Sequence, residues 1–506
     1  MIPIIDDFLN KTTMYRLVLY VVIALIVIAV VLSFFKLLPF SPVSLIATSL
    51  FLVAVSWVAN FIFAKTFEAV CNVESVYITA LILALIITPM SSISDVPFLC
   101  FAALLSVASK YILAIGKKHV FNPVAISVVL TSMFLGQSAS WWIGTFVMFP
   151  FVLAGGILIV KKTRRFAMVL CFLGVAILVI IEASILKNAD VTGLFHKILF
   201  DSPILFFASV MFTEPLTTPP KKDMQIIYGA IVGFLFAPQV HLGAFYTTPE
   251  IALVAGNVFS YFVSPKEKLV LKLREKKQLA TGIYDFVFLP DKKFLFVPGQ
   301  YLEWTLAHSG SDSRGNRRYF TIASSPMETG LRLGVRFYDK PSSFKKSLAN
   351  MNVGDKIIAG QLAGEFVLPK NPNEKCVFIA SGIGITPFRS MIESLIDKRE
   401  VRPITLFYGN TFASEVVYKD VFDRAEKELG IKTIYTITDT TSVSPDWYGE
   451  TGYINDVMIR EQVPDFLERL FYISGSHNSV NAIRRTLKSM GVSNKNIKTD
   501  FFPGLA

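Results

Sequence analysis

The chain has 506 residues and a formal net charge of +11, and 53% of its residues are hydrophobic while only 17% are charged. This composition excludes an ordinary soluble protein of one domain and indicates a membrane protein with several domains. A nucleic-acid partner is not expected, because the basic residues gather in short loops between apolar segments, where they orient a protein in a membrane.

The first half of the chain, to about Pro265, is built from apolar segments. A membrane-spanning helix needs about 20 apolar residues, which predicts about ten spans. We expect them at residues 14–36, 42–64, 73–90, 96–115, 120–136, 141–160, 166–186, 196–213, 225–243 and 248–264. Lysine and arginine precede the first span and follow the even-numbered ones, whereas the alternate loops carry almost none. This asymmetry predicts a multi-pass protein of the cell membrane, with both termini and the whole second half in the cytoplasm.

Two polar segments lie at the expected ends of these spans, where burial in lipid is costly and polar residues are candidates for function. In residues 118–123 an Asn-Pro pair can break a helix, and residues 212–220 hold three prolines, three threonines and one carboxylate. Either these are only helix ends and turns, or they form a site for a flavin or a quinone. The candidate binding residues are Lys118, Phe121, Asn122, Thr213, Glu214, Thr217 and Thr218.

A haem route through the membrane is the rival interpretation. It needs paired histidines on facing helices, but the three histidines of this half, His119, His196 and His241, stand at the ends of different spans. The four cysteines form no C-x-x-C pair, so neither an iron–sulfur cluster nor a zinc site is expected. We therefore expect neither a haem nor another metal site.

Beyond residue 265 charged residues become dense, which marks the main domain boundary. Residues 266–372 alternate short β-rich runs with turns, and this predicts an antiparallel β-barrel. Its expected strands are residues 283–288, 301–306, 318–323, 331–337 and 356–359. Residues 373–506 alternate strand and helix patterns, which predicts a parallel α/β sheet. Its expected strands are 376–380, 404–408, 433–438 and 470–473, and its expected helices are 387–398, 415–429 and 479–490. The predicted fold class is multidomain, with a polytopic α-helical membrane domain at residues 1–265.

Two motifs in this second half point to redox chemistry. Residues 317–326 read Arg-Arg-Tyr-Phe-Thr-Ile-Ala-Ser-Ser-Pro, and an aromatic ring and a hydroxyl beside arginine suit a flavin and its pyrophosphate. Residues 380–387 read Ala-Ser-Gly-Ile-Gly-Ile-Thr-Pro between a predicted strand and a predicted helix. Glycines there let a dinucleotide pyrophosphate approach the backbone and the helix N-terminus.

The membrane half resembles a known family. Residues 74–85, 118–123 and 213–219, followed by Tyr228 and Gly229, are similar, in this order, to the Nqr-B/Rnf-D family, whose members are membrane subunits of the sodium-translocating NADH:quinone reductase and of the Rnf complex. The resemblance covers about residues 14–264 and implies a flavin in the membrane. The family attaches a flavin to a threonine in a Ser-Gly-Ala-Thr-type motif, but here residues 187–193 offer Thr192 in another context. We therefore expect FMN or riboflavin, bound non-covalently.

The second half, about residues 267–506, resembles the ferredoxin–NADP reductase family. The resemblance implies FAD in the barrel and NADH or NADPH in the α/β domain. It assigns the flavin pyrophosphate to Arg318, the ring contact to Phe320 and the hydrogen bond to flavin N5 to Thr321. The other implied FAD residues are Gln300, Tyr301, Tyr319, Ser324, Ser342, Ser343 and Lys345, and which of the last three contacts phosphate stays open.

The same resemblance assigns the nicotinamide nucleotide to the glycine turn and to two later segments. The implied residues are Gly382, Gly384, Thr386, Pro387 and Gly475, with Ser474 near the nicotinamide and Phe502 covering the flavin. Thr321, Ser474 and Phe502 are the expected catalytic residues. Residues 411–414 lack the arginine that many relatives use for the 2′-phosphate of NADP, which argues against strict NADP use.

These patterns predict an electron-transport oxidoreductase. NAD(P)H would reduce FAD on the cytoplasmic side, and electrons would pass through the membrane flavin to an extracytoplasmic acceptor. One alternative is a membrane NAD(P)H:quinone reductase, in which electrons stop at a lipid quinone. The other is a reductase whose membrane half is only an anchor.

Overall fold

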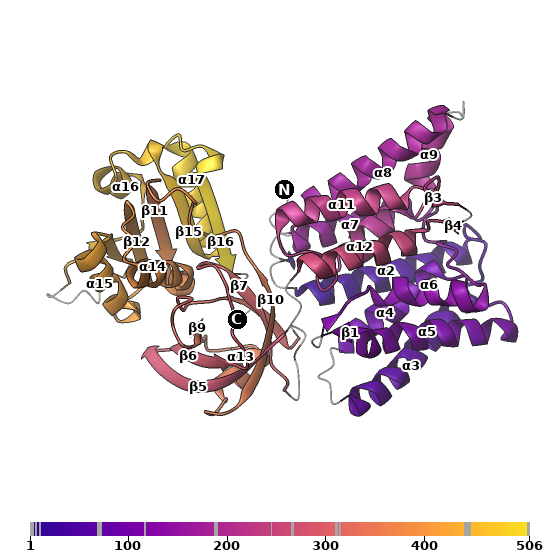
Figure 1. Ribbon diagram of the computed structural model, residues 1–506, viewed down its shortest axis with the longest axis horizontal. Helices are drawn as coiled ribbons and strands as arrows, with labels where there is room; N and C mark the ends of the chain where they lie inside the picture. Colours follow the sequence, from indigo (N-terminus) through magenta and orange to yellow (C-terminus); the bar gives the residue numbers. More distant parts are fainter. Residues whose placement is uncertain are drawn as a thin grey trace. The chain divides into compact units, whose positions relative to one another are not determined.

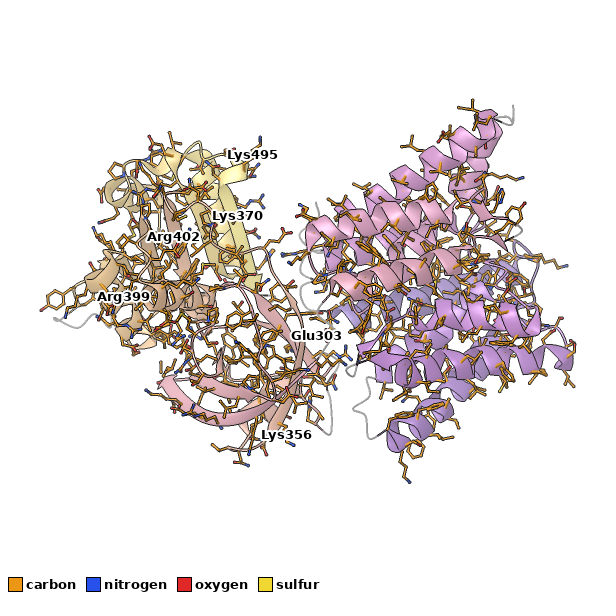
Figure 2. All side chains as sticks on the ribbon, viewed as in Figure 1. Glu303, Lys356, Lys370, Arg399, Arg402 and Lys495 are labelled. Atoms are coloured by element: carbon orange, nitrogen blue, oxygen red, sulfur yellow. The ribbon has the colours of Figure 1, made fainter. Side chains whose placement is uncertain are left out.

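The computed structural model describes the chain except residues 1–4, 6, 7, 10, 11, 68–72, 116, 117, 187–190, 244, 265–267, 309–311, 313, 314, 440–446 and 503–506. The chain divides into two compact units, Met1–Lys268 and Leu269–Ala506 (Figure 1), and side chains fill the interior of each (Figure 2). The first unit is helical and the second contains two sheets with their covering helices.

The helical unit follows the apolar segments of the sequence. Its helices are α2 (Met14–Phe34), α3 (Pro42–Thr66), α4 (Val73–Ile86), α5 (Val96–Ile112), α6 (Pro123–Leu135), α7 (Phe149–Thr163), α8 (Phe166–Leu186), α9 (Val191–Phe200), α10 (Ile204–Phe206), α11 (Lys222–Phe236) and α12 (Pro249–Val263). Among the described residues, four stretches are long and apolar enough to cross a membrane: Met14–Phe34, Pro42–Thr66, Ile93–Ile112 and Phe166–Leu186. The figure of ten crossings, and the orientation of the termini, stay predictions.

The loop before α7 shortens one of the expected spans. The backbone amides of Ser140 and Trp141 both donate to Ile86 O, at 2.9 and 2.8 Å. The loop thereby satisfies a carbonyl at the C-terminal end of α4, where the helix itself provides no partner. As a result, the segment predicted as a span at residues 141–160 becomes helical only at Phe149.

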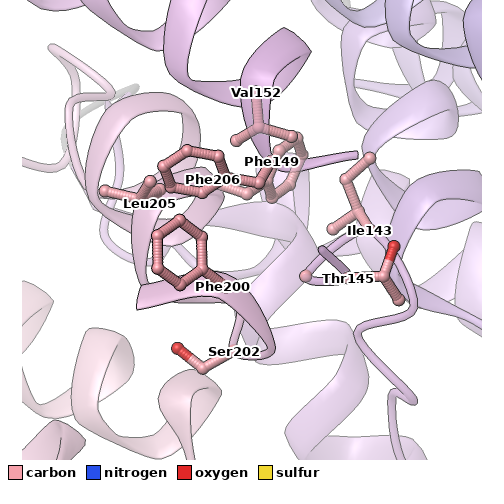
Figure 3. Close-up of a pocket in the computed structure, with 9 residues that line it drawn as sticks. Ile143, Thr145, Phe149, Val152, Phe200, Ser202, Leu205 and Phe206 are labelled. Atoms are coloured by element: carbon pink, nitrogen blue, oxygen red, sulfur yellow. The ribbon is translucent and has the colours of Figure 1, made fainter. Parts of the chain in front are cut away.

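The span predicted at residues 196–213 is also interrupted. Helices α9 and α10 separate just before Pro203, and a proline cannot donate the backbone bond that would continue a helix. The chain then continues as a π-helical turn, η2 (Phe207–Met211). A small pocket lies beside the break (Figure 3). Its walls are mainly Phe149, Val152, Phe200, Leu205 and Phe206.

The first sheet of the second unit is antiparallel, in the order β8-β7-β10-β5-β6-β9. Its strands are β5 (Leu269–Ala280), β6 (Ile283–Pro290), β7 (Tyr301–Thr305), β8 (Arg317–Thr321), β9 (Leu331–Arg336) and β10 (Lys356–Ala363), and helix α13 spans Ser343–Ala349. A backbone bond of 2.9 Å from Ala323 N to Arg332 O joins the chain after β8 to β9, at the other end of the order. The predicted antiparallel pairing is confirmed, whereas full closure into a barrel stays a prediction.

The second sheet is parallel, in the order β14-β13-β12-β11-β15-β16. Its strands are β11 (Cys376–Ser381), β12 (Ile404–Asn410), β13 (Lys432–Ile437), β14 (Glu450–Thr451), β15 (Leu470–Ser476) and β16 (Ile497–Phe502). Its helices are α14 (Thr386–Lys398), α15 (Lys419–Leu429), α16 (Asp456–Gln462) and α17 (His477–Ser489). Alternate residues of β11 enter two different hydrophobic clusters, one with α14 and α15 and the other with α16 and α17. The predicted parallel α/β sheet is confirmed, and helices cover both of its faces.

One helix boundary differs from the prediction. The helix expected at residues 415–429 begins only at Lys419, because Tyr418 has a φ of 58°. That value lies in the left-handed region, which non-glycine residues seldom adopt and which a helix cannot contain.

Candidate functional site

Strand β8 carries the motif predicted to hold a flavin. It pairs with β7 so that Thr321 lies opposite Tyr301. Because side chains alternate along a strand, Arg318 and Phe320 share one face of β8, and Tyr319 and Thr321 share the other. The Tyr301 and Tyr319 rings meet edge-on on that second face, with centroids 5.7 Å apart. The predicted flavin residues are therefore divided between the two faces of one strand pair.

The guanidinium of Arg318 is oriented by its surroundings. It is only 5% exposed, and it donates to Gly315 O at 3.1 Å and to Arg317 O at 2.6 Å. Its central carbon lies 5.3 Å from the centroid of the Phe344 ring, on which Phe320 also packs at 6.0 Å. A guanidinium held in this way presents a planar fork that matches a pyrophosphate. Arg318 therefore fits the role that the resemblance assigns to it.

The hydroxyl of Thr321 suits a donor to flavin N5. Thr321 is 3% exposed and lies opposite Tyr301 in the strand pair. Ser324 is fully buried, and its hydroxyl accepts a bond of 3.2 Å from Arg332 N. The position of Thr321 on this strand therefore fits the role of donor to flavin N5 that the resemblance assigns to it.

The turn before β7 requires a glycine. Gly299 has a φ of +94°, and a Cβ at this position would lie 1.9 Å from Phe366 O. Gln300 closes the turn, since its Oε1 accepts from Val297 N at 2.8 Å and its carbonyl accepts from Ile322 N at 3.0 Å. The turn therefore fastens β7 to the segment that follows β8.

The phosphate segment at α13 contains three predicted residues in different settings. Ser342 caps the helix by accepting from Lys345 N at 3.3 Å. The hydroxyl of Ser343 lies 3.0 Å from Nε2 of His308. The ammonium of Lys345 donates to Arg336 O at 2.8 Å, which turns it toward the end of β9. Which of the three residues contacts a phosphate stays open.

The glycine turn between β11 and α14 packs backbone against backbone. A Cβ on Gly384 would lie 2.5 Å from Ser474 O and 2.6 Å from Gly475 N. A Cβ on Gly475 would lie 2.8 Å from the Cβ of Ser381. The two glycines therefore allow β15 to lie directly against the turn. This leaves a bare backbone cradle at the N-terminus of α14, where a pyrophosphate is favoured.

Around this cradle the other predicted nucleotide residues come together. Gly382 has a φ of +55°, and Thr386 and Pro387 begin α14, with the Thr386 hydroxyl donating to Ile383 O at 3.2 Å. Ser474, at the carboxyl end of β15, is fully buried, and within the described residues its hydroxyl has no hydrogen-bond partner. An orphaned buried hydroxyl fits a position that bonds a bound nicotinamide.

Three predicted positions lie partly outside the described residues. Phe502 ends β16, where its backbone pairs with Ser476, but its side chain is outside the description. Thr192 belongs to α9 and Lys118 to the short strand β2 (Lys118–His119), and the side chains of both are likewise outside it. Their roles stay predictions.

A link between the flavin strand and α14 was not among the predicted residues. Arg389 Nη1 donates to Ala323 O at 2.7 Å, and Ser390 Oγ donates to Ser324 O at 2.7 Å. Arg389 also pairs with Glu328 at 2.8 Å. No sequence signal marks this link, because Arg389 alone looks like a solvent-facing charge, whereas the structure buries α14 along most of its length. The structure thus joins the two predicted redox motifs through one helix.

In the helical unit the two predicted polar segments meet at one carboxylate. Asn122 Nδ2 donates to Glu214 Oε2 at 2.9 Å, and Thr217 Oγ1 donates to the same oxygen at 3.2 Å. Nε2 of His119 lies 3.2 Å from Glu214 Oε1. The proximity that the sequence only suggested for these segments is therefore present, and it is centred on Glu214.

Two residues that were not among the predicted binding residues extend this cluster. The side chain of Asn257 accepts from Asn122 N at 2.7 Å, and its Nδ2 lies 3.1 Å from the Tyr228 hydroxyl. The Tyr228 ring stacks on Phe212 with a centroid distance of 4.9 Å. Phe121, next to Asn122, is half-buried.

The threonines of the second segment are held by an arginine. Arg165 Nη1 donates to Thr213 O at 3.1 Å and also bonds the Thr218 hydroxyl. Both threonines are buried, at 2% exposure. Arg165 follows a run of basic residues that the sequence places in a loop, so nothing local distinguishes it from a charge that orients the protein in a membrane.

Comparisons with known proteins match the reductase-like part of the chain. A family model described as the oxidoreductase NAD-binding domain matches residues 378–485. A flavohemoprotein of Oceanobacillus iheyensis is 23% identical over 243 residues, which are 46% of this chain and 58% of that protein. The stachydrine N-demethylase reductase component Stc4 of Rhizobium meliloti is 28% identical over 216 residues, 42% of this chain and 60% of its own length. One component of the Na(+)-translocating NADH-quinone reductase of Yersinia pestis is 28% identical over 200 residues, with shares of 37% and 49%.

The chain therefore spans between 49% and 60% of the length of these curated relatives. The FAD/NAD-binding domain of a nitric oxide dioxygenase from Vibrio cholerae covers 46% of the chain at 20% identity, with a TM-score of 0.42. The predicted similarity of the first half to the membrane-subunit family stays a prediction. The second half, in contrast, contains an oxidoreductase NAD-binding domain, as its glycine turn indicates.

Proposed function

We propose that the protein is a membrane flavoprotein that takes hydride from cytoplasmic NADH or NADPH onto FAD and sends the electrons across the membrane. The electrons would pass through a second flavin, FMN or riboflavin, held non-covalently in the helical unit, to an extracytoplasmic acceptor. The observation that carries the proposal is that one chain combines two kinds of unit. One contains an NAD-binding domain bonded to the strand that carries the predicted flavin motif, and the other is apolar and encloses a buried polar cluster.

In the reductase half, the chain's own residues bind and orient. Arg318 would hold the FAD pyrophosphate and Thr321 would donate to flavin N5. The glycine cradle around Gly384 would receive the nicotinamide dinucleotide, and the orphaned Ser474 hydroxyl would bond the nicotinamide end. When bound, FAD supplies the conversion of a hydride into electrons that leave singly.

The cluster around Glu214 supports a second carrier. Polar groups buried in an apolar unit are costly and mark functional sites in membrane proteins. The cluster offers a carboxylate, amides and threonine hydroxyls, which can bond the polar edge of a flavin or the carbonyls of a quinone. A quinone at this site would make the protein a membrane NAD(P)H:quinone reductase, and an empty helical unit would make it an anchor.

The full-length protein in sealed liposomes tests the proposal. NADH or NADPH is added outside, to the molecules whose reductase half faces outward, and membrane-impermeant ferricyanide is trapped inside. Reduction of the trapped ferricyanide is expected, together with FAD and a second flavin when flavins are extracted and counted per chain. If FAD is reduced but the trapped ferricyanide is not, transmembrane transfer is refuted. Reduction of a quinone analogue without any internal acceptor would favour the quinone reductase, and FAD alone would favour the anchor.

A further inference from the structure

Helix α14 holds the backbone of the segment that follows the flavin strand. Arg389 Nη1 donates to Ala323 O, and Ser390 Oγ donates to Ser324 O, both at 2.7 Å. Arg389 is 5% exposed and Ser390 is fully buried. The same helix starts at Thr386, in the glycine turn. One rigid element therefore carries the dinucleotide cradle at its end and grips the flavin segment one turn later.

Arg389 is fixed in turn by a carboxylate in the turn between β8 and β9. Its Nη1 and Nη2 lie 2.8 and 3.1 Å from the two oxygens of Glu328. Glu328 also accepts from Arg332 Nε at 2.7 Å and from Ser325 N at 2.6 Å. Burial by itself would raise the pKa of Glu328, but the hydrogen bond and the charge of Arg389 hold it below its usual value. The carboxylate is therefore ionised at neutral pH and can hold the guanidinium.

These contacts close into a circuit. Arg332 Nη1 lies 2.5 Å from Asp285 Oδ2, and Asp285 Oδ1 accepts from the Tyr418 hydroxyl at 3.0 Å. The Tyr418 ring lies under the guanidinium of Arg389, with a distance of 5.2 Å to its centroid. We name these residues, Arg389, Glu328, Arg332, Asp285 and Tyr418, the Arg389 circuit. The charges of its two arginines equal those of its two carboxylates. Asp285, Glu328 and Arg332 belong to the part of the chain that forms the antiparallel sheet, and Arg389 and Tyr418 belong to the part that forms the parallel sheet.

Tyr418 shows that this circuit specifies geometry as well as attachment. Its φ of 58° is a conformation that costs energy in a residue with a side chain, and such conformations persist where the surroundings impose them. Burial raises the pKa of Tyr418 well above its usual range, so its hydroxyl stays protonated and continues to donate to Asp285. The residue before α15 thus adopts a strained backbone conformation, and in that conformation the Tyr418 hydroxyl reaches Asp285 and completes the circuit.

We propose that Arg389 and Ser390 are positioning residues for hydride transfer, which set the approach of the nicotinamide to the flavin by fixing Ala323 and Ser324, respectively, against α14. The proposal rests on the proposed function, in which NAD(P)H reduces a flavin bonded by Thr321. A misplacement of about 1 Å between reacting groups can cost about 100-fold in rate. The two buried bonds reach the backbone only two and three residues after Thr321, so they are suited to control the rate of hydride transfer. Bonds that merely joined the two sheets could lie anywhere between them.

The test uses the full-length protein in detergent, reduced anaerobically by NADH or NADPH in a rapid-mixing spectrophotometer. The variants are Arg389→Gln, Arg389→Lys and Ser390→Ala. The matched control is Arg402→Gln (Figure 2), because Arg402 also bonds one carboxylate, of Glu400, and one backbone carbonyl, Pro369 O at 2.8 Å, away from the flavin segment. The readouts are the limiting rate of flavin bleaching, the half-saturating nucleotide concentration, the FAD content and the flavin midpoint potential.

For Arg389→Gln we expect the limiting rate to fall about 10- to 100-fold, while the half-saturating concentration, the FAD content and the potential stay as in the wild type. The limiting rate of Arg389→Lys should lie between those of the wild type and Arg389→Gln, since lysine keeps the charge but cannot bond the carbonyl and both carboxylate oxygens together. Arg402→Gln should behave as the wild type. A wild-type limiting rate in Arg389→Gln would overturn the proposal, as would a loss explained by missing FAD or weaker nucleotide binding.

Should Arg389→Gln fail to fold, Ser390→Ala decides the question, because it removes one bond and no charge. A limiting rate reduced about 3- to 10-fold is expected from the loss of one hydrogen bond, and an unchanged rate would overturn the proposal. Failure of the proposed function is recognised separately, because the wild type itself would then not be reduced by either nucleotide.

Discussion

Replacing Gly384 by alanine should push the glycine turn away from β15 and weaken dinucleotide binding while FAD remains bound. The new Cβ would lie 2.5 Å from Ser474 O and 2.6 Å from Gly475 Cα, both backbone atoms that no side-chain rotation can move. Ordinary contacts begin near 3.4 Å, so the turn or the strand has to shift by about 0.9 Å, the difference from 2.5 Å. Overpacking of this kind costs about 1–3 kcal/mol. Because about 1.4 kcal/mol is a factor of ten in affinity, the Kd for the dinucleotide should rise about 5- to 150-fold.

The assay is calorimetric titration of the purified protein with NAD+ and NADP+, with FAD content measured on the same sample. Gly409→Ala, in the neighbouring strand β12, is the matched control, since its Cβ would make only ordinary contacts, with side-chain atoms of Ile454 and Thr436 at 3.4 and 3.5 Å and with Ala380 O at 3.7 Å. The control should keep the wild-type Kd. Gly384→Ala could instead bind the dinucleotide as tightly as the control does, with normal FAD content. The turn would then accommodate a Cβ without disturbing the binding site, and the assignment of the dinucleotide to this backbone cradle would be refuted.

Thr321→Val keeps the shape of the side chain and removes the donor, so FAD reduction by NAD(P)H should slow about tenfold, the worth of one hydrogen bond; an unchanged stopped-flow rate would remove Thr321 from the chemistry. The pKa of Glu328 is lowered from 4.5 in the folded protein, so the unfolded state binds more protons and the contribution of Glu328 to the free energy of unfolding is lost as the pH falls through the folded pKa. Melting followed by flavin fluorescence should show this acid loss in the wild type and a smaller one in Glu328→Gln, and equal pH dependence in both would contradict it. Glu214→Gln should lower the extracted FMN or riboflavin per chain without lowering FAD, whereas Glu74→Gln, which breaks the Arg16 pair of 3.3 Å, should not; equal flavin content in both variants would place the second flavin elsewhere.

Local patterns made the redox motifs predictable. The turn before α14 combines a buried strand, glycines and a Thr-Pro helix start within residues 376–387, and each of these signals acts over a few residues. Strand β5 was not predicted. Its alternation of buried Leu269, Leu271 and Leu273 is followed by exposed charged residues and by a register shift after Leu273. A regular period is the main sequence signal of a strand, and here it is broken in the middle.

The partners of the motifs could not be read from the sequence. Arg389 and Glu328 are separated by 61 residues, and each alone looks like a solvent-facing charge. The same holds in the helical unit, where apolar composition predicted spans but could not show that the amides of Ser140 and Trp141 cap α4 at Ile86 O. Such breaks depend on which helices become neighbours, and that is decided by packing across the whole unit.

The Arg389 circuit also limits how this protein can be recombined. A chimera joined at residue 372, with its two sheets taken from different parents, would keep every local motif. It would, however, lose the native pairing of Arg389 with Glu328 wherever the other parent has no carboxylate at that position. A buried charge that loses its counter-ion costs about 3–5 kcal/mol, which is a large share of the stability of a domain, about 5–15 kcal/mol. The two sheets should therefore be inherited, and transplanted by engineers, as a single cassette, with viable breakpoints falling outside the stretch from Asp285 to Tyr418.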